Sequence, residues 1–360
     1  MTYRLVPKTF RVLGSGAALP GPALSTDELL EKTRPLGVTN TRLGRALATR
    51  LGIQFRHISR DFREAMEPPR EAHSNPDLAA EALRGALTEA LVAPGDLGYL
   101  LGHTTTPHTL LPPNIAWTAD LLGYDGPYAE LRQACTGFAN ALQLATGMLA
   151  DAGAPPIAVV GSETGSLFFD PRVADENADQ ILNLVQMGDG AGSIVLGHDD
   201  GRPGARLEFP YFGTIGLRKS PGFALRAGGS AEPFLREAGV FTFDHDAGHV
   251  RALGPELFAQ GLAAVRRAGV DVERIDWVLP HQANARIGEL LGPELGLRPE
   301  KFIVDADRVG NLGSASIWVA LHRLRASGKL REGETVLVLG AEATKFLFGG
   351  FVYRHGPARA

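Results

Sequence analysis

Short apolar runs alternate along the chain with longer segments in which apolar residues recur at helical spacing. The runs at 99–106 and 157–163 predict buried strands. The Ala- and Leu-rich segment 76–92 predicts a helix, with Asn75 at its cap and Pro76 in its first turn. Such alternation is typical of α/β folds, and we expect a mostly parallel sheet.

The second half of the chain repeats this order. A predicted helix at 255–268 precedes W-V-L-P-H-Q-A-N at 277–284, which resembles Y-L-L-G-H-T-T-T at 99–106, so that His281 matches His103 178 residues earlier. G-A-E-A-T-K-F-L-F at 340–348 resembles G-S-E-T-G-S-L-F-F at 161–169 at an offset of 179. Two matches at nearly one offset predict a duplicated unit, with halves at 1–200 and 201–360.

The composition is that of an ordinary globular protein. Apolar residues make up 44% of the 360 residues and charged residues 21%, and the net charge is −4. These values give no sign of nucleic acid or an anionic membrane as a partner, and no apolar run is long enough to span a bilayer. The chain begins without the apolar segment of a signal peptide, and its single cysteine cannot form an internal disulfide, so we expect a cytoplasmic protein.

The single cysteine, Cys135, precedes a segment that carries no charge through Ala150. Such a segment predicts a buried helix with Cys135 in its first turn. A helix start favours the thiolate, which attacks acyl thioesters, and its free N–H groups can hold the resulting oxyanion. On position alone, Cys135 is equally well explained as a small buried apolar residue.

The repeat supplies possible partners for this thiol. The offset carries Cys135 onto 313–314, in the loop G-N-L-G-S-A-S-I at 310–317. Equivalent loops of a duplicated fold meet near its pseudo-twofold axis, so Cys135, His281 and Asn311 can share one site. Taken singly, His281 is explained as a structural residue at a strand end and Asn311 as a turn residue beside glycine.

These motifs together resemble β-ketoacyl-acyl-carrier-protein synthase III, a ketosynthase of the thiolase fold. The matching stretches are A-C-T-G-F around Cys135, H-Q-A-N-A-R-I at 281–287, G-N-L-G-S-A-S at 310–316, G-D-G-A-G at 188–192, T-T-T-P at 104–107 and T-R-L-G-I at 49–53. They follow the family's order over nearly the whole chain. The resemblance implies an α/β thiolase fold, in which duplicated βαβαβαββ halves form an αβαβα layered sandwich.

The resemblance also implies a role for each motif residue. Cys135 would be the acylated nucleophile, while His281 and Asn311 would hydrogen-bond the malonyl thioester carbonyl and stabilise the enolate left by loss of CO₂. Arg286 would contact an acidic acyl carrier protein, although a solvated surface arginine explains it equally well. The family implies a homodimer that uses coenzyme A or phosphopantetheine thioesters as substrates and has no permanently bound cofactor. The histidines show no metal-ligand spacing.

Three positions depart from the family pattern. Ala46 stands where the family has a tryptophan that stacks on the adenine of coenzyme A, although Arg50 is kept. The family's glycine-rich C-terminal motif is replaced by A-T-K-F-L-F-G at 343–349, so the oxyanion-binding N–H falls near Thr344, and Thr344 and Phe346 become candidates for the substrate wall. Leu111 replaces a gating phenylalanine, which indicates a roomier acyl pocket.

The sequence therefore favours a decarboxylating condensing enzyme of a specialised pathway, such as polyketide or fatty-acid-derived biosynthesis. Two alternatives stay open. One is an acyltransferase that moves the acyl group to an alcohol or amine without decarboxylation. The other is a non-catalytic partner subunit of a ketosynthase pair, against which the intact Cys–His–Asn set argues.

Overall fold

The computed structural model describes residues 2–225, 227–230, 232 and 243–357. Its first half contains β1 (Thr2–Leu5), β2 (Thr9–Ala18), β3 (Leu24–Ser25), α1 (Thr26–Thr33), α2 (Thr41–Leu51), β4 (Phe55–Arg56), α3 (Asn75–Ala90), β5 (Tyr99–His103), α4 (Asn114–Leu122), β6 (Tyr128–Leu131), α5 (Gly137–Met148), β7 (Ile157–Glu163), α6 (Ala178–Gln186) and β8 (Gly190–His198). The second half contains β9 (Arg206–Thr214), β10 (Phe223–Ala224), β11 (Asp244–His245), α7 (Ala247–Arg267), β12 (Trp277–Pro280), α8 (Ile287–Leu295), α9 (Ala306–Val309), α10 (Ser316–Ala326), β13 (Thr335–Glu342) and β14 (Leu347–Arg354).

The strand order repeats between the two halves. Strands run β6-β5-β7-β8-β2 in the first half and β12-β13-β14-β9 in the second, and a parallel bridge between Val278 and Phe302 takes the place of the β5–β6 pairing. The halves join where β2 pairs with β9. The predicted duplication is thus present in the topology, and the proposed boundary between 200 and 201 falls in the connection from β8 to β9.

The prediction of a mostly parallel sheet is wrong. Strands β5, β6 and β7 pair in parallel, as do β12 and β13, but β8, β2, β14 and β9 all pair antiparallel with their neighbours. In the first half β8 lies directly beside β7, the strand before it, and in the second half β14 lies beside β13. No helix crosses the sheet between the two strands of either pair, so each pair is antiparallel.

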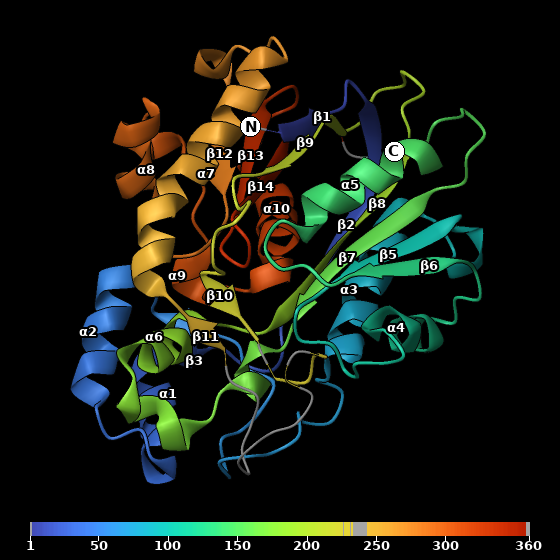
Figure 1. Ribbon diagram of the computed structural model, residues 1–360. Helices are drawn as coiled ribbons and strands as arrows, with labels where there is room; N and C mark the ends of the chain where they lie inside the picture. The colour runs from blue at the N-terminus through green and yellow to red at the C-terminus, as the bar shows by residue number, and fades with distance from the viewer. Residues whose placement is uncertain (1, 226, 231, 233–242, 358–360) are drawn as a thin grey trace.

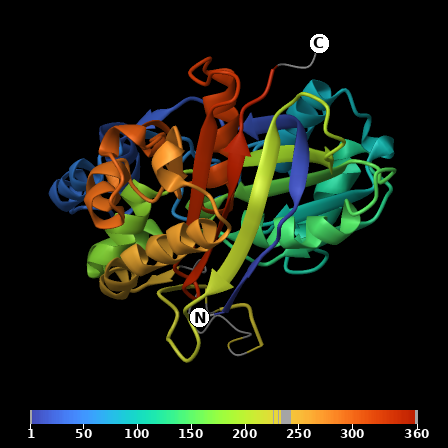
Figure 2. The ribbon, with the colours of Figure 1, turned by 90° about the horizontal axis from the view of Figure 1, so that it is seen from above.

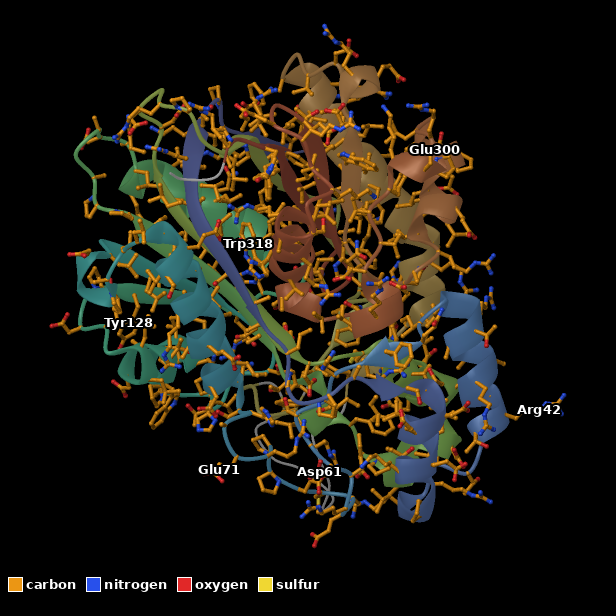
Figure 3. The ribbon with its side chains drawn as sticks, turned by 180° about the vertical axis from the view of Figure 1, so that it is seen from behind. Arg42, Asp61, Glu71, Tyr128, Glu300 and Trp318 are labelled. Carbon is orange, nitrogen blue, oxygen red and sulfur yellow. The ribbon has the colours of Figure 1, made fainter. Side chains whose placement is uncertain are left out.

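Two helices from different halves form the middle layer. Helices α5 and α10 lie between the two groups of strands, α3 and α4 cover the outer face of one group, and α7 and α8 cover that of the other (Figures 1 and 2). Phe138 of α5 packs edge-on against Trp318 of α10 with ring centroids 5.7 Å apart, and against Phe351 of β14 at 5.9 Å. Figure 3 shows Trp318 inside the molecule, whereas Tyr128 and Arg42 point outward on opposite sides. This arrangement is the predicted αβαβα sandwich.

Two predicted helix starts need correction. Helix α3 begins at Asn75, and the cap is Ser74, whose backbone N–H donates to Asp77 at 3.0 Å. The Asn75 side chain is buried and donates to the Thr106 carbonyl at 2.7 Å, so a tertiary contact determines its place. Helix α7 begins at Ala247 rather than at Pro255, because Asp246 caps it by accepting from the His249 N–H at 2.9 Å.

Candidate active site

The three motif residues lie on loops at the ends of neighbouring elements. Cys135 lies in the turn between β6 and α5, His281 directly follows β12, and Asn311 lies between α9 and α10. Because α5 and α10 are side by side in the middle layer, the loops before them come from different halves and meet (Figure 1). The Ser314 hydroxyl donates to the Gln133 carbonyl at 3.2 Å, which joins the Asn311 loop to the Cys135 loop.

Two glutamates connect these loops to the opposite half: one binds the Cys135 loop and the other binds the Asn311 loop. The Thr136 N–H and hydroxyl donate to Glu342, the last residue of β13, at 2.9 and 2.7 Å. The Ser314 hydroxyl donates to Glu163, the last residue of β7, at 2.5 Å. Thr136 and Ser314 are 178 residues apart and the glutamates 179, so the cross-connection is itself part of the repeat. Both glutamates lie in the stretches matched by the repeat, although no role was predicted for them. Their equivalent positions in the repeat were the signal that could have identified them.

The His281 loop is tied to the Asn311 loop through Gln186 at the end of α6. The Gln186 side-chain amide donates to the Ala283 carbonyl at 2.7 Å, and its backbone carbonyl accepts from the Asn311 N–H at 2.8 Å. The Gln282 side chain accepts from the Asp305 N–H at 2.8 Å and strengthens the same connection. The structure therefore brings together the loops that carry Cys135, His281 and Asn311.

The Asn311 amide is oriented by its own loop. Its oxygen accepts from the Gly313 N–H at 3.0 Å and from the Ser316 hydroxyl at 3.4 Å. Since both partners are donors, the oxygen faces them and the NH₂ group remains as a donor. This is the orientation needed to donate a hydrogen bond to a carbonyl or enolate oxygen.

His281 is a neutral imidazole at physiological pH. It is 5% exposed, and burial lowers its pKa to about 4. Its backbone N–H donates to the Leu339 carbonyl at 2.8 Å, which fixes the residue on β13, and within the described chain its Nδ1 has no hydrogen-bond partner. A neutral imidazole offers one N–H donor and one acceptor nitrogen.

His103, the counterpart of His281 in the repeat, packs against Gly137, the first residue of α5, just after the Cys135 loop. It is 1% exposed, and burial lowers its pKa to about 3, although the Ala134 carbonyl acts in the opposite direction. Its ring fills the space beside two glycines: a Cβ on Gly137 would lie 2.5 Å from its Nδ1, and one on Gly161 would lie 2.5 Å from its Cε1. The glycine of A-C-T-G-F is therefore required for packing.

The expected thiolate is not supported by the electrostatics. Cys135 precedes Thr136, the N-cap residue of α5, and thus lies outside the helical turn. Burial raises the pKa of its thiol well above the usual range, and the charges of Glu342 and Glu163 raise it further. The hydrogen bond from the Cys135 backbone N–H is the one influence that lowers this pKa, and the others outweigh it. Cys135 therefore rests as a thiol.

Replacing Glu342 with glutamine is expected to shift the pH dependence of thiol labelling to lower pH. The carboxylate disfavours a second negative charge on Cys135, so its neutralisation lowers the thiol pKa, while glutamine keeps an oxygen for Thr136. The rate of alkylation by iodoacetamide, followed by intact mass, measures this because the chain has one cysteine.

Glu130→Gln is the matched control for this measurement. The Glu130 side chain is also largely enclosed, but it accepts from the Ile115 N–H at 2.9 Å and is not among the groups that act on the Cys135 pKa. If Glu342→Gln and Glu130→Gln have the same labelling profile as the wild type, Glu342 does not set the reactivity of the thiol.

A cavity lies beside the site and was not predicted from the sequence. It encloses about 350 Å³, its mouth included, and is bordered largely by apolar residues of α6 and of the segments after β7 and before β11. Met187 lines it and also forms a bridge with Asn311, and Gly165 lines it two residues after Glu163. Four lining residues fall in the repeat stretch at 161–169, but neither that stretch nor the rest of the lining pointed to a cavity.

The residues predicted for the substrate wall lie at different distances from this cavity. The Thr344 hydroxyl donates to Glu342 and so joins the same carboxylate that holds Thr136. Phe346 is fully buried, with its ring 4.8 Å from that of His249 between centroids. Neither residue lines the cavity.

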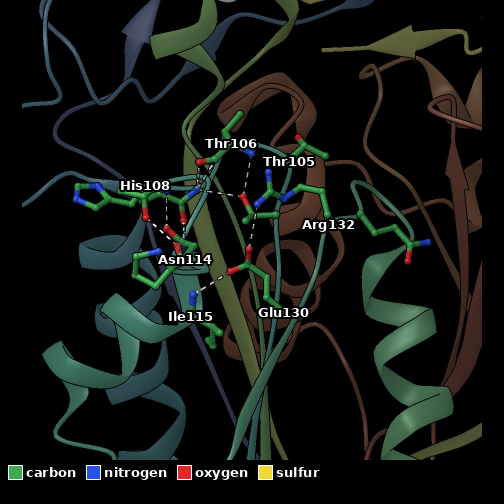
Figure 4. A network of polar contacts seen from close by, with 12 residues as sticks. Thr105, Thr106, His108, Asn114, Ile115, Glu130 and Arg132 are labelled. Carbon is green, nitrogen blue, oxygen red and sulfur yellow. Dashed lines mark hydrogen bonds and ion pairs between the residues drawn. The ribbon is translucent and has the colours of Figure 1, made fainter. Parts of the chain in front are cut away.

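Leu111 lies on the surface and is 86% exposed. Its loop is fixed at both sides: the His108 N–H donates to the Asn114 side chain at 3.0 Å, and the nearby Ile115 N–H donates to Glu130 (Figure 4). In the single chain Leu111 therefore does not gate the cavity.

The two predicted arginines are brought together on one exposed surface. Arg50 is in the last turn of α2, and Arg286 is the N-cap residue of α8. The Ala285 N–H donates to the Leu51 carbonyl at 2.8 Å, so the residues beside both arginines are bonded. Arg286 also pairs with Glu289 at 2.9 Å.

The described residues contain neither a membrane-spanning helix nor a cluster of metal ligands. No helix among them is long and apolar enough to cross a membrane. They also contain no group of three or more His, Cys, Asp or Glu side chains that could hold a metal ion.

Comparison with known proteins agrees with this geometry. The sequence model of 3-oxoacyl-[acyl-carrier-protein (ACP)] synthase III matches residues 129–212, and that of its C-terminal part matches residues 265–354. The chain is 32% identical over 363 residues to β-ketoacyl-[acyl-carrier-protein] synthase III of Sphingopyxis alaskensis, covering 98% of this chain and all of that protein.

Solved structures show the same likeness over the whole fold. AbyA1, a tetronic acid condensing enzyme, superposes with a TM-score of 0.83 at 26% identity, covering 96% of this chain and 99% of AbyA1. FabH of Pseudomonas aeruginosa PAO1, a 3-oxoacyl-(acyl carrier protein) synthase III, gives 0.77 at 25% identity, covering 98% and 100%. The predicted thiolase fold and the predicted resemblance are confirmed. The chain therefore belongs to the β-ketoacyl-[acyl-carrier-protein] synthase III family of acyl-transferring condensing enzymes.

Proposed function

We propose that this chain joins an acyl group carried on Cys135 to a malonyl thioester with loss of CO₂. The observation that carries the proposal is the fixed amide of Asn311, whose oxygen is occupied by the Gly313 N–H so that its NH₂ group is free to donate. Acyl transfer to an alcohol needs donors only at the oxyanion of its tetrahedral intermediate, whereas decarboxylation also needs donors at the malonyl carbonyl, where an enolate develops. This favours condensation over plain acyl transfer.

In the first half-reaction the Cys135 sulfur attacks the acyl thioester carbonyl. A new C–S bond forms, the bond to the donor sulfur breaks, and the thiol proton leaves with the donor as its thiol. Because the Cys135 pKa is raised, a base is needed, and the neutral imidazole of His281 can accept that proton and pass it on.

In the second half-reaction the bond between the malonyl α-carbon and its carboxylate breaks, and CO₂ leaves. The electron pair forms an enolate, whose oxygen receives hydrogen bonds from His281 and Asn311. The enolate carbon then attacks the acyl-cysteine carbonyl, and the Cys135 sulfur leaves and is reprotonated. Thioesters of coenzyme A or phosphopantetheine supply both substrates, with no permanently bound cofactor.

The cavity beside Met187 takes the acyl chain in this proposal. Its walls are mostly apolar, as is usual for pockets that bind small molecules. The bridge between Met187 and Asn311 places its wall next to the donor loop. Thr344 does not line this cavity; through Glu342 it is proposed to border the site on the side of the Cys135 loop.

The surface carrying Arg50 and Arg286 is proposed to receive an acidic acyl carrier protein. Both side chains are exposed and lie on bonded neighbouring segments. With Ala46 also exposed, no aromatic ring stands at that position to stack on the adenine of coenzyme A, which favours a carrier-bound donor.

A homodimer is proposed through the face formed by α4, β6 and the loop before α4. Strand β6 is at the end of the strand order, and this face exposes the apolar side chains of Leu110, Leu111, Trp117, Leu121 and Tyr128. An unpaired edge beside an apolar patch is typical of a subunit interface. Sedimentation should give twice the chain mass, whereas a single-chain mass at micromolar concentration would contradict the dimer.

The proposed reaction is tested by supplying malonyl-carrier protein and a panel of acyl donors on carrier protein, coenzyme A and a short pantetheine mimic. Release of CO₂ with a β-ketoacyl product is expected, and the rate with the carrier-bound donor should fall most steeply with salt. Acylation of Cys135 without CO₂ from any donor would exclude condensation, and an acylated alcohol as product would establish plain transfer instead.

The proposed setting is a specialised biosynthetic pathway in the cytoplasm. The likeness to a tetronic acid condensing enzyme and the altered positions Ala46 and Thr344 support the pathway. The single cysteine, which cannot form an internal disulfide, supports the compartment.

A further inference from the structure

The cavity beside the active site is bordered by a buried polar side chain whose nitrogen has no hydrogen-bond partner in the described chain. Its lining includes Phe168, Phe169, Leu184 and Phe243, together with the amide of Asn183 from α6. Asn183 is 3% exposed, and within the described chain its Nδ2 has no hydrogen-bond partner. A buried donor left unpaired costs free energy, so it calls for a ligand.

The rest of the Asn183 side chain is fixed. Its Oδ1 lies 2.7 Å from Nδ1 of His245 on β11, next to α6 in Figure 1. Burial lowers the His245 pKa, so the ring is neutral at physiological pH and its one proton can be placed on Nδ1 to donate to Asn183. The amide is thereby held with its NH₂ end away from His245, in a residue that borders the cavity.

Other polar groups of the cavity are occupied within the protein. The Gln180 side-chain NH₂ donates to the Phe243 carbonyl at 2.8 Å. The Ser166 hydroxyl and N–H both donate to Asp189. Among the side chains on this wall in the described chain, Asn183 is thus the one whose buried nitrogen has no hydrogen-bond partner at all.

We infer that the acyl chain accepted here carries an oxygen along its length, as a hydroxyl or an oxo group, which accepts a hydrogen bond from Asn183. The inference rests on the proposed function for the identity of the ligand as an acyl chain. A purely alkyl chain would bury the Asn183 donor without a partner, and a site built to bind an oxygen discriminates against the analogue that lacks it. A hydroxyl and a ketone share this chemistry.

The test measures binding without catalysis. Pantetheine amides, which cannot acylate Cys135, are prepared with an alkyl chain, with a hydroxyl and with an oxo group at successive carbons of chains matched in length. Calorimetry on the full chain should show that an oxygenated amide binds about tenfold more tightly than its alkyl counterpart. Asn183→Leu should abolish this difference, mainly by weakening the oxygenated ligand.

Two further variants make the outcome specific. Asn183→Asp keeps an oxygen toward His245 but removes the NH₂ donor, so it should also lose the preference. Leu184→Met alters the same wall without changing a polar group and should keep it. Equal binding of alkyl and oxygenated amides to the wild type, or a preference that survives both Asn183 variants, overturns the inference.

The arms of the experiment also separate this inference from the reaction. If the protein prefers oxygenated amides but releases no CO₂, the result supports an oxygen on the acyl chain and contradicts the decarboxylating condensation. Condensation without any preference would do the reverse. Which oxygenated series binds more tightly identifies the hydroxyl or the ketone as the natural group.

Discussion

Replacing Cys135 with serine is expected to reduce product formation by about 10⁴-fold or more. The substitution changes one atom and leaves the Thr136–Glu342 and His103 contacts of the loop in place. A serine hydroxyl is a far weaker nucleophile than a thiol, and the surrounding carboxylates that raise the thiol pKa disfavour an alkoxide still more. Intact mass after exposure to an acyl thioester should show no covalent acyl group.

Binding separates this loss from misfolding. Since the acyl cavity does not include Cys135, the serine variant should bind the pantetheine amides as the wild type does. Retention of more than about one tenth of product formation would show that the acyl group is not carried on this residue. In that case the protein would have to act on both substrates in a single complex.

Replacing Asn311 with leucine is expected to slow condensation by about 10²- to 10³-fold while Cys135 is still acylated. The amide NH₂ is proposed to donate to the enolate oxygen, which develops only in the decarboxylating step. Acylation uses Cys135 and His281 and does not need this donor. Separate measurement of acyl-enzyme formation and CO₂ release therefore distinguishes the two half-reactions.

Ser316→Ala is the control for Asn311. It removes the weaker 3.4 Å contact to the Asn311 oxygen but leaves the 3.0 Å bond from the Gly313 N–H and the NH₂ donor. CO₂ release should therefore stay near the wild-type rate. If Asn311→Leu slows acylation and CO₂ release equally, Asn311 maintains the site as a whole, and the argument for an enolate donor fails.

Glu163 and Glu342 each bind a loop of the other half, which gives a reason for the duplicated halves to act as one unit. Glu342 of the second half holds the Cys135 loop, and Glu163 of the first half holds the Asn311 loop through Ser314. A shift of one half relative to the other would move the Cys135 loop and the Asn311 loop at once. The same carboxylates raise the thiol pKa, so the connection that positions Cys135 also keeps it protonated until substrate and base are present.

Local pattern was sufficient for much of the fold. Strand β7 lies at 157–163 as predicted, and α10 begins at Ser316, where the apolar spacing begins. Helix starts were less secure, because Asn75 has a cap-forming side chain that tertiary contacts to Thr106 draw inward. Strand direction was not encoded locally, since a strand with both faces covered has the same composition in parallel and antiparallel pairs.

By itself the sequence determined the duplication and the fold class and predicted the set Cys135, His281 and Asn311, because a repeat offset and short motifs are properties of residue order. The tertiary structure alone decided the protonation state of Cys135, since burial and the charges of Glu342 and Glu163 come from residues distant in the chain. It alone decided that Leu111 is exposed and that Asn183, which borders a cavity, has an unpaired donor within the described chain. Electrostatics and packing depend on distances in space, which the order of residues does not contain.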